Sequence, residues 1–205
     1  MRPGLLRRDA GLIDTEVMTG RVIALIGPSS VGKSSTAREL QQLLVDPHLV
    51  VGLDDFFAMF PHHWADHPRG PGPGFWYEDD VDDGSPRARI RCGDVGQRLL
   101  TGMRGAVRAL LDAGNDLILD EMPIDETILP AWREDLRGYP TSWVLLTAPL
   151  AVLEERERRR PSGRHLGNAR GHFWLTELEG FDLRIDTTEL TPSEVAARVV
   201  ASRLF

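Results

Sequence analysis

The sequence has a single cysteine, Cys92, among its 205 residues. One cysteine cannot form a disulfide within the chain, and it cannot supply a cysteine-based metal cluster. A chain that uses neither is typical of a reducing compartment, so we expect a cytoplasmic protein.

Long apolar runs and an excess of basic charge are lacking as well. No apolar run approaches the roughly 20 residues of a membrane span, and residues 1–18 lack the apolar core of a signal peptide. The formal net charge is −7, whereas nucleic-acid-binding proteins need a basic face. We therefore expect neither a membrane nor a nucleic-acid partner. We expect a poorly ordered extension over residues 1–18 and a single domain over residues 19–205.

The sequence does contain a phosphate-loop (Walker A) motif, GPSSVGKSS, over residues 27–35. An apolar run, VIALI, precedes it and a helix-like stretch follows it, which is the context that the motif requires. Two glycines let the backbone N–H groups turn toward phosphate oxygens, Lys33 bridges the outer phosphates, and the hydroxyl of Ser34 ligates Mg²⁺. The predicted nucleotide-binding residues of this loop are Gly27, Pro28, Ser29, Ser30, Val31, Gly32, Lys33, Ser34 and Ser35.

The rest of the chain alternates between strand-like and helix-like patterns. Short apolar runs predict strands over residues 22–26, 49–53, 116–120, 142–148 and 181–186. Residues 94–113 predict a helix that ends before Gly114, and Thr191 with Glu194 predicts a capping box for the last helix. This alternation predicts an α/β fold with a mainly parallel sheet, whose ligands gather at the carboxyl ends of the strands.

Acidic residues follow two of the predicted strands. Asp54 and Asp55 come directly after the second strand, where one carboxylate can accept the proton of an attacking hydroxyl while the other caps a helix. Asp120 and Glu121 end the strand LILDE, and Asp120 is a candidate Mg²⁺ ligand; the alternative is an ordinary acidic residue at a strand end.

An arginine-rich segment, LEERERRRPSGR, predicts a cationic lid. On a helix Arg156 and Arg160 share a face, and Arg164 follows the break at Pro161. These side chains are candidates to stabilise a phosphoryl group in transfer, whereas Arg158 and Arg159 point elsewhere. The alternative is a solvated helix whose arginines pair with neighbouring glutamates.

Residues 60–92 form a long stretch rich in Pro, Gly and Asp, which we expect to be irregular. Its aromatic side chains either pack within the stretch or line a pocket for a second substrate. The spacing of His62, His63 and His67 with Asp66 matches no zinc pattern. The candidate substrate residues here and just after the second strand are Asp55, Phe57, Trp64, Phe75, Trp76 and Tyr77.

From about Arg21 to the last helix, the chain resembles the chloramphenicol phosphotransferases, small P-loop kinases. The motifs that carry the resemblance are GPSSVGKS, GLDDFFAMFP, AGNDLILDE, LEERERRRPSGR and FDLRIDTT. The resemblance implies a three-layer fold, a parallel five-stranded sheet of order 2-3-1-4-5, and a helical lid. It also implies that Asp54 is the catalytic base and that ATP and Mg²⁺ are used. Residues 60–92 do not follow the family pattern well.

Together these features predict an ATP-dependent enzyme that phosphorylates a hydroxyl of a small natural product, for example an antibiotic such as chloramphenicol. Lys33, Asp54, Arg156 and Arg160 are its predicted catalytic residues, and Arg164 is a further nucleotide contact. One alternative is a kinase of a nucleotide, sugar nucleotide or other metabolite, similar to the zeta-toxin kinases. Another is a non-catalytic module that ATP switches. The guanine-specifying motif of GTPases is absent from the sequence. The oligomeric state stays open.

Overall fold

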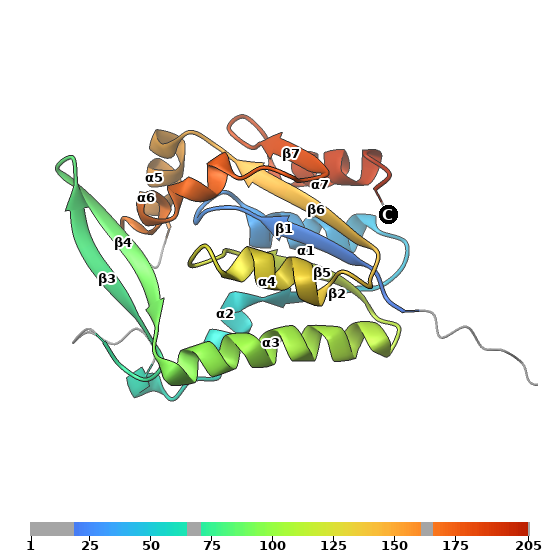
Figure 1. Ribbon diagram of the computed structural model, residues 1–205. Helices are drawn as coiled ribbons and strands as arrows, with labels where there is room; N and C mark the ends of the chain where they lie inside the picture. The colour runs from blue at the N-terminus through green and yellow to red at the C-terminus, as the bar shows by residue number, and fades with distance from the viewer. Residues whose placement is uncertain (1–18, 65–70, 161–165, 205) are drawn as a thin grey trace, which may run out of the picture.

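The computed structural model describes residues 19–64, 71–160 and 166–204. The predicted extension over residues 1–18 lies outside these ranges, as do Asp66, His67 and Arg164. Strands and helices alternate along the chain, as the sequence predicts (Figure 1). In chain order the elements are β1 (Val22–Ile26), α1 (Lys33–Leu43), β2 (His48–Gly52), α2 (Leu53–Phe57), η1 (His62–Trp64), β3 (Phe75–Asp82), β4 (Ser85–Cys92), α3 (Asp94–Asp112), β5 (Asp116–Glu121), α4 (Ile128–Asp135), β6 (Thr141–Thr147), α5 (Leu150–Arg158), α6 (Asn168–Gly171), η2 (Phe173–Glu177), β7 (Leu183–Asp186) and α7 (Pro192–Ala201).

Five strands form the central sheet in the order β2-β5-β1-β6-β7. All neighbouring pairs are parallel. Numbering only these five strands along the chain gives the order 2-3-1-4-5, so the prediction is confirmed. Because β1 is central, the loop that follows it lies at the middle of the carboxyl edge of the sheet.

Helices cover both faces of this sheet, which gives three layers (Figure 1). Along β1, Val22, Ala24 and Ile26 pack in one apolar cluster with α3 and α4. Ile23 and Leu25 pack in the other cluster with α1 and α7. Burial on both faces explains the continuous apolar run of β1. None of the helices in the described ranges is long and apolar enough to cross a membrane.

Local signals in the sequence set the ends of the helices. Gly114, which follows α3, has a φ of +84°, the left-handed conformation typical of a helix end. At the start of α7, the Thr191 hydroxyl accepts a hydrogen bond from the backbone N–H of Glu194, whose carboxylate accepts one from the N–H of Thr191. Both predictions are confirmed.

The expectation that residues 60–92 are irregular is wrong for residues 75–92. Strands β3 and β4 form an antiparallel hairpin beside the main sheet (Figure 1). Asp83 and Gly84 at its turn have φ values of +47° and +72°, the conformation of a tight hairpin turn. This segment is thus an ordered arm beside the carboxyl edge of the sheet.

Backbone contacts attach the hairpin to α6. The N–H of Ala88 on β4 donates to the carbonyl oxygen of Gly167 over 3.0 Å. A Cβ atom on Gly171 would lie 1.8 Å from the carbonyl oxygen of Ala88. The Arg170 side chain forms ion pairs with Glu154 on α5 and Asp82 on β3. Strand β4, α6 and α5 are therefore packed together with no side chain between Gly171 and the hairpin.

We predict that Gly171→Ala lowers the free energy of unfolding, because the added methyl group collides with the backbone of β4. Overpacking of this kind costs about 1–3 kcal/mol. The control is Gly102→Ala on α3, where an added Cβ meets nothing within 4 Å and should stabilise the helix by roughly 0.5–1 kcal/mol. Urea unfolding of both variants measures the difference, and equal stability would contradict the packing described here.

Candidate functional site

The loop between β1 and α1 has the backbone geometry of an anion-binding turn. Ser30 and Gly32 have positive φ values of +64° and +103°. Alternation of this kind turns successive N–H groups to one side of the chain, where they can bind phosphate oxygens. Gly27 is required for a second reason, because a Cβ there would lie 2.5 Å from the carbonyl oxygen of Leu146 on β6.

Lys33, the single lysine of the sequence, folds back over this loop. Its ammonium group donates to the carbonyl oxygens of Gly27 and Pro28, each over 2.9 Å. The side chain is buried, and burial lowers the pKa of the amine, while the nearby carboxylates of Asp120 and Glu121 raise it. Lys33 is therefore a desolvated donor at the start of α1, held by loop carbonyls.

The two aspartates after β2 differ in their contacts. The carboxylate of Asp55 accepts a hydrogen bond from the backbone N–H of Gly52 over 2.9 Å and so caps α2. Asp54 accepts no such hydrogen bond from the residues that the structure describes. Desolvation raises the pKa of Asp54, the charge of Asp120 raises it further, and the charges of Lys33 and Arg160 lower it. Asp54 thus shares the electrostatic environment of the loop, whereas Asp55 turns back toward β2.

Asp120 on β5 lies beside β1, which precedes the phosphate loop, and beside β2, which precedes Asp54. In the sheet it is level with Leu25 of β1 on one side and with Gly52 of β2 on the other. Ser34 exposes its side chain in the first turn of α1. A hydroxyl and a carboxylate are oxygen donors of the kind that Mg²⁺ uses together with phosphate oxygens and water. These residues therefore fit the predicted Mg²⁺ site. The described ranges contain no cluster of three or more His, Cys, Asp or Glu that could hold a metal.

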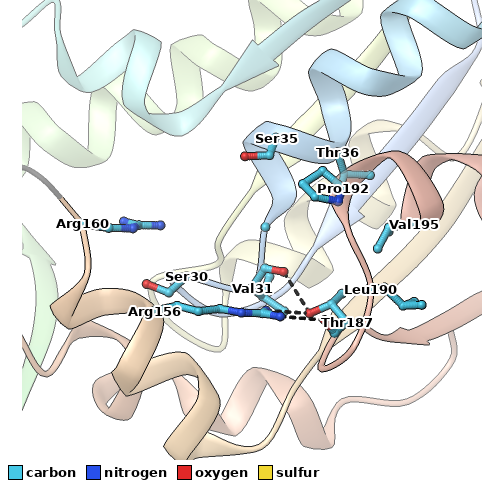
Figure 2. A pocket seen from close by; sticks show the side chains of 11 residues that line it. Ser30, Val31, Ser35, Thr36, Arg156, Arg160, Thr187, Leu190, Pro192 and Val195 are labelled. Carbon is cyan, nitrogen blue, oxygen red and sulfur yellow. Dashed lines mark hydrogen bonds between the residues drawn. The ribbon is translucent and has the colours of Figure 1, made fainter.

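A cleft of about 290 Å³ runs along the outer side of the loop (Figure 2). Its floor is the loop and the start of α1, and its walls come from α5 and from the segment that joins β7 to α7. On the α7 side, Leu190, Pro192 and Val195 form an apolar surface on which the flat ring of a ligand can pack. The lining residues are Ser30, Val31, Gly32, Ser35, Thr36, Arg156, Arg160, Thr187, Leu190, Pro192 and Val195.

The arginines of α5 separate as the helical spacing predicts. Arg156 and Arg160 line the cleft, whereas Arg158 and Arg159 form ion pairs with Glu155 on the exposed side of the helix. Arg156 is hydrogen-bonded to the segment after β7. Within the described ranges Arg160 has no side-chain partner, and Figure 2 shows its guanidinium group over the open part of the cleft.

The aromatic side chains that were predicted to line one pocket lie on both faces of β3 and in η1. Phe75 stacks on Phe57 of α2 with ring centroids 4.2 Å apart, and both rings are buried in the core. Tyr77 meets Phe75 edge to face and lies on the same face of β3. Trp76 points to the opposite face, because side chains alternate along a strand. The four predicted aromatics therefore do not form one wall, and Trp64 lies in η1 with its ring against His63.

The structure reveals the environment of two further polar groups. Glu121 is buried; desolvation raises its pKa to about 7, although Trp132 donates to its carboxylate over 2.9 Å. Thr187 is buried at the cleft wall and bonds to both Arg156 and the loop. Thr187 lies in the motif FDLRIDTT, but the motif does not show these contacts, because the partners of Thr187 are distant in sequence.

Comparisons with known proteins agree with this architecture. The family model described as chloramphenicol phosphotransferase-like protein matches residues 20–204. A curated protein of Mycobacterium tuberculosis, named "Putative O-phosphotransferase Rv2636", is 28% identical over 182 residues, which are 86% of this chain and 79% of that protein.

Solved kinase structures share the fold. One is an APS kinase of Mycobacterium tuberculosis in complex with AMPPNP and APS, with a TM-score of 0.62, 15% identity, and coverage of 90% of this chain and 97% of that one. Another is a shikimate kinase of Acinetobacter baumannii in complex with shikimate, with a TM-score of 0.58, 19% identity, and coverage of 89% and 92%.

We predict that Lys33→Ala weakens the binding of a Mg²⁺–nucleotide complex while the protein stays folded. Losing a charge-assisted hydrogen bond to phosphate costs about 10- to 100-fold in affinity, whereas removal of a buried charge relieves a desolvation penalty. Fluorescence titration with mant-ADP and Mg²⁺ measures the affinity. Arg38→Ala, on the exposed side of α1, is the control, and equal affinity in wild type and Lys33→Ala would refute the assignment of the loop.

Proposed function

The chain belongs to the chloramphenicol phosphotransferase-like family, and on this basis we propose that it transfers a phosphoryl group from ATP to a hydroxyl of a small natural product. The observation that carries the proposal is the different environment of the two aspartates: Asp55 is used as a cap, which leaves the carboxylate of Asp54 available beside Lys33 and Asp120. A carboxylate at this position suits a reaction with a hydroxyl.

In the proposed reaction, the loop of residues 27–35 and Lys33 hold the phosphates of ATP. The acceptor oxygen forms a bond to the γ-phosphorus while the bond from that phosphorus to the oxygen shared with the β-phosphate breaks, and ADP leaves. The proton of the hydroxyl passes to the carboxylate of Asp54. The raised pKa of Asp54 makes it a better proton acceptor.

Cationic groups balance the charge that spreads over the phosphoryl oxygens. Lys33 supplies one, and Arg160 supplies another from the α5 side. Bound Mg²⁺, held by Ser34 and Asp120, would supply further positive charge between the phosphates. Arg164, outside the described residues, remains a proposed nucleotide contact.

We predict that Asp54→Asn lowers the rate of phosphoryl transfer by about 10²- to 10⁴-fold, as the loss of a general base does, with little change in nucleotide affinity. Asp55→Asn is the matched control. It weakens the cap of α2, which costs about 0.5–2 kcal/mol in stability, and should have a milder effect on the rate.

A coupled assay for ADP formation measures the rates, and unfolding experiments measure the stability of both variants. If Asp55→Asn were the inactive variant and Asp54→Asn the active one, the roles of the two residues would be reversed. If neither substitution lowered the rate, the carboxylate mechanism would be wrong.

The acceptor site is proposed to lie between α2 and the hairpin, on the side where Tyr77 contacts Phe75. An aromatic side chain beside α2 favours an acceptor with an apolar part, such as an antibiotic of the chloramphenicol kind. The alternatives are a nucleotide, a sugar nucleotide or another metabolite as acceptor, and a protein in which ATP is a switch alone. In the last case an acceptor would not change the rate of ATP turnover.

We predict that partly apolar alcohols, with chloramphenicol as the first test, stimulate ADP formation more than sugar phosphates do. Tyr77→Ala should then raise the KM for the acceptor and leave nucleotide affinity unchanged. Trp76→Ala, on the opposite face of β3, is the control and should have the smaller effect. A preference for sugar phosphates, or a loss of nucleotide affinity in Tyr77→Ala, would move the acceptor site elsewhere.

A further inference from the structure

Thr187, directly after β7, is hydrogen-bonded to the phosphate loop, to Arg156 and to the end of β6. Its hydroxyl donates to the carbonyl oxygen of Val31 in the phosphate loop over 3.1 Å. The same hydroxyl accepts a hydrogen bond from Nη1 of Arg156 on α5 over 3.0 Å. Its backbone N–H donates to the carbonyl oxygen of Thr147 at the end of β6 over 2.8 Å. Figure 2 shows the side chain between Arg156 and Val31.

We propose that Thr187 is a positioning residue for nucleotide binding. Its hydroxyl holds the phosphate loop through the Val31 carbonyl, and its contacts with Arg156 fix that side chain in the cleft wall. The inference rests on the proposed function in one respect, that the loop binds a nucleotide. It assigns a role to a residue whose hydroxyl is already engaged by the Val31 carbonyl and by Arg156.

The conformation of the loop explains why Val31 needs a partner. Val31 lies between Ser30 and Gly32, which both have positive φ values. When such a turn directs its N–H groups toward an anion, its carbonyl groups point away and need donors of their own. The Lys33 ammonium group donates hydrogen bonds to the carbonyls of Gly27 and Pro28, and the Thr187 hydroxyl donates one to the carbonyl of Val31. A nucleotide draws Lys33 toward its phosphates, whereas Thr187 can stay in place.

Arg156 is committed to the same segment. Its Nη2 atom donates to the carbonyl oxygen of Thr187 over 2.6 Å and to that of Thr188 over 3.2 Å, in addition to the bond from Nη1. A guanidinium group with three protein acceptors stiffens the wall that it belongs to. Arg160, which has no side-chain partner in the described ranges, is left as the cation for phosphate. This division of roles differs from the expectation that Arg156 and Arg160 both act on the phosphoryl group.

The test compares two adjacent threonines. Thr187→Val removes the hydroxyl and leaves the Val31 carbonyl without a donor, and we expect it to weaken the binding of Mg²⁺ and mant-ADP about 10-fold. Thr187→Ser keeps the hydroxyl and should restore affinity to within about 3-fold of wild type. Thr188→Val is the matched control, because the Thr188 hydroxyl bonds to the carboxylate of Asp186 and not to the loop; it should stay within about 2-fold.

A double variant tests the link to Arg156. If both residues act through one network, Thr187→Val combined with Arg156→Ala should bind mant-ADP no more than about 2-fold more weakly than Arg156→Ala alone. Full additivity, unchanged affinity in Thr187→Val, or an equal loss in Thr188→Val would each overturn the proposal.

Hydrogen exchange without nucleotide separates this inference from the proposed function. Thr187→Val should speed the exchange of the amides of residues 31–35, and Thr188→Val should not. Failure of wild-type protein to bind mant-ADP would refute the proposed function and, with it, the link of Thr187 to nucleotide binding, while faster exchange in Thr187→Val would still show that Thr187 holds the loop. Unchanged exchange of these amides in Thr187→Val would refute the positioning role, whether or not nucleotide binds.

Discussion

The buried ammonium group of Lys33 is the constraint on which the carboxyl edge of the sheet depends. A desolvated cation is costly unless hydrogen-bond acceptors and opposite charges compensate it. Two loop carbonyls accept hydrogen bonds from the ammonium group, and the carboxylates whose charges act on it come from β5 and α2. The order of the strands is what brings these acids together, because β5 lies between β1 and β2. The strand order of the fold thus determines which carboxylates balance the charge of Lys33.

Much of the fold follows from local sequence signals. The five strands of the main sheet are short apolar runs, Gly114 and Thr191 mark helix ends, and the phosphate-loop motif identifies the central strand. The strand order came from the family resemblance, since alternation alone permits several orders. Among the site residues, the helical spacing of the arginines was enough to separate Arg156 and Arg160 from Arg158 and Arg159. Arg159 and Arg160 follow the end of α5 directly, and their N–H groups still bond to carbonyl oxygens of α5.

What the sequence did not reveal depends on contacts between distant segments or on weak patterns. Asp83-Gly84 is a hairpin signal, and charged and apolar residues alternate along RARIRC of β4. Charged residues on both faces of β3, however, hide the alternation that marks a strand there. Thr187 is hydrogen-bonded to Arg156, which lies 31 positions before it, and to Val31, which lies 156 positions before it. No short motif can encode contacts over such separations. That Asp55 is the residue that caps α2 is visible only from the position of the Gly52 N–H.

The attachment of the hairpin to α6 has a mechanical consequence. Gly167 and Gly171 bring backbone against backbone, so no rotatable side chain can absorb a relative displacement of the two segments. Glu157 of α5 also accepts hydrogen bonds from the N–H groups of Gly167 and Ala169. These direct contacts join β4, α6 and α5. A displacement of α5 would therefore be passed on to the hairpin rather than absorbed by side chains between them.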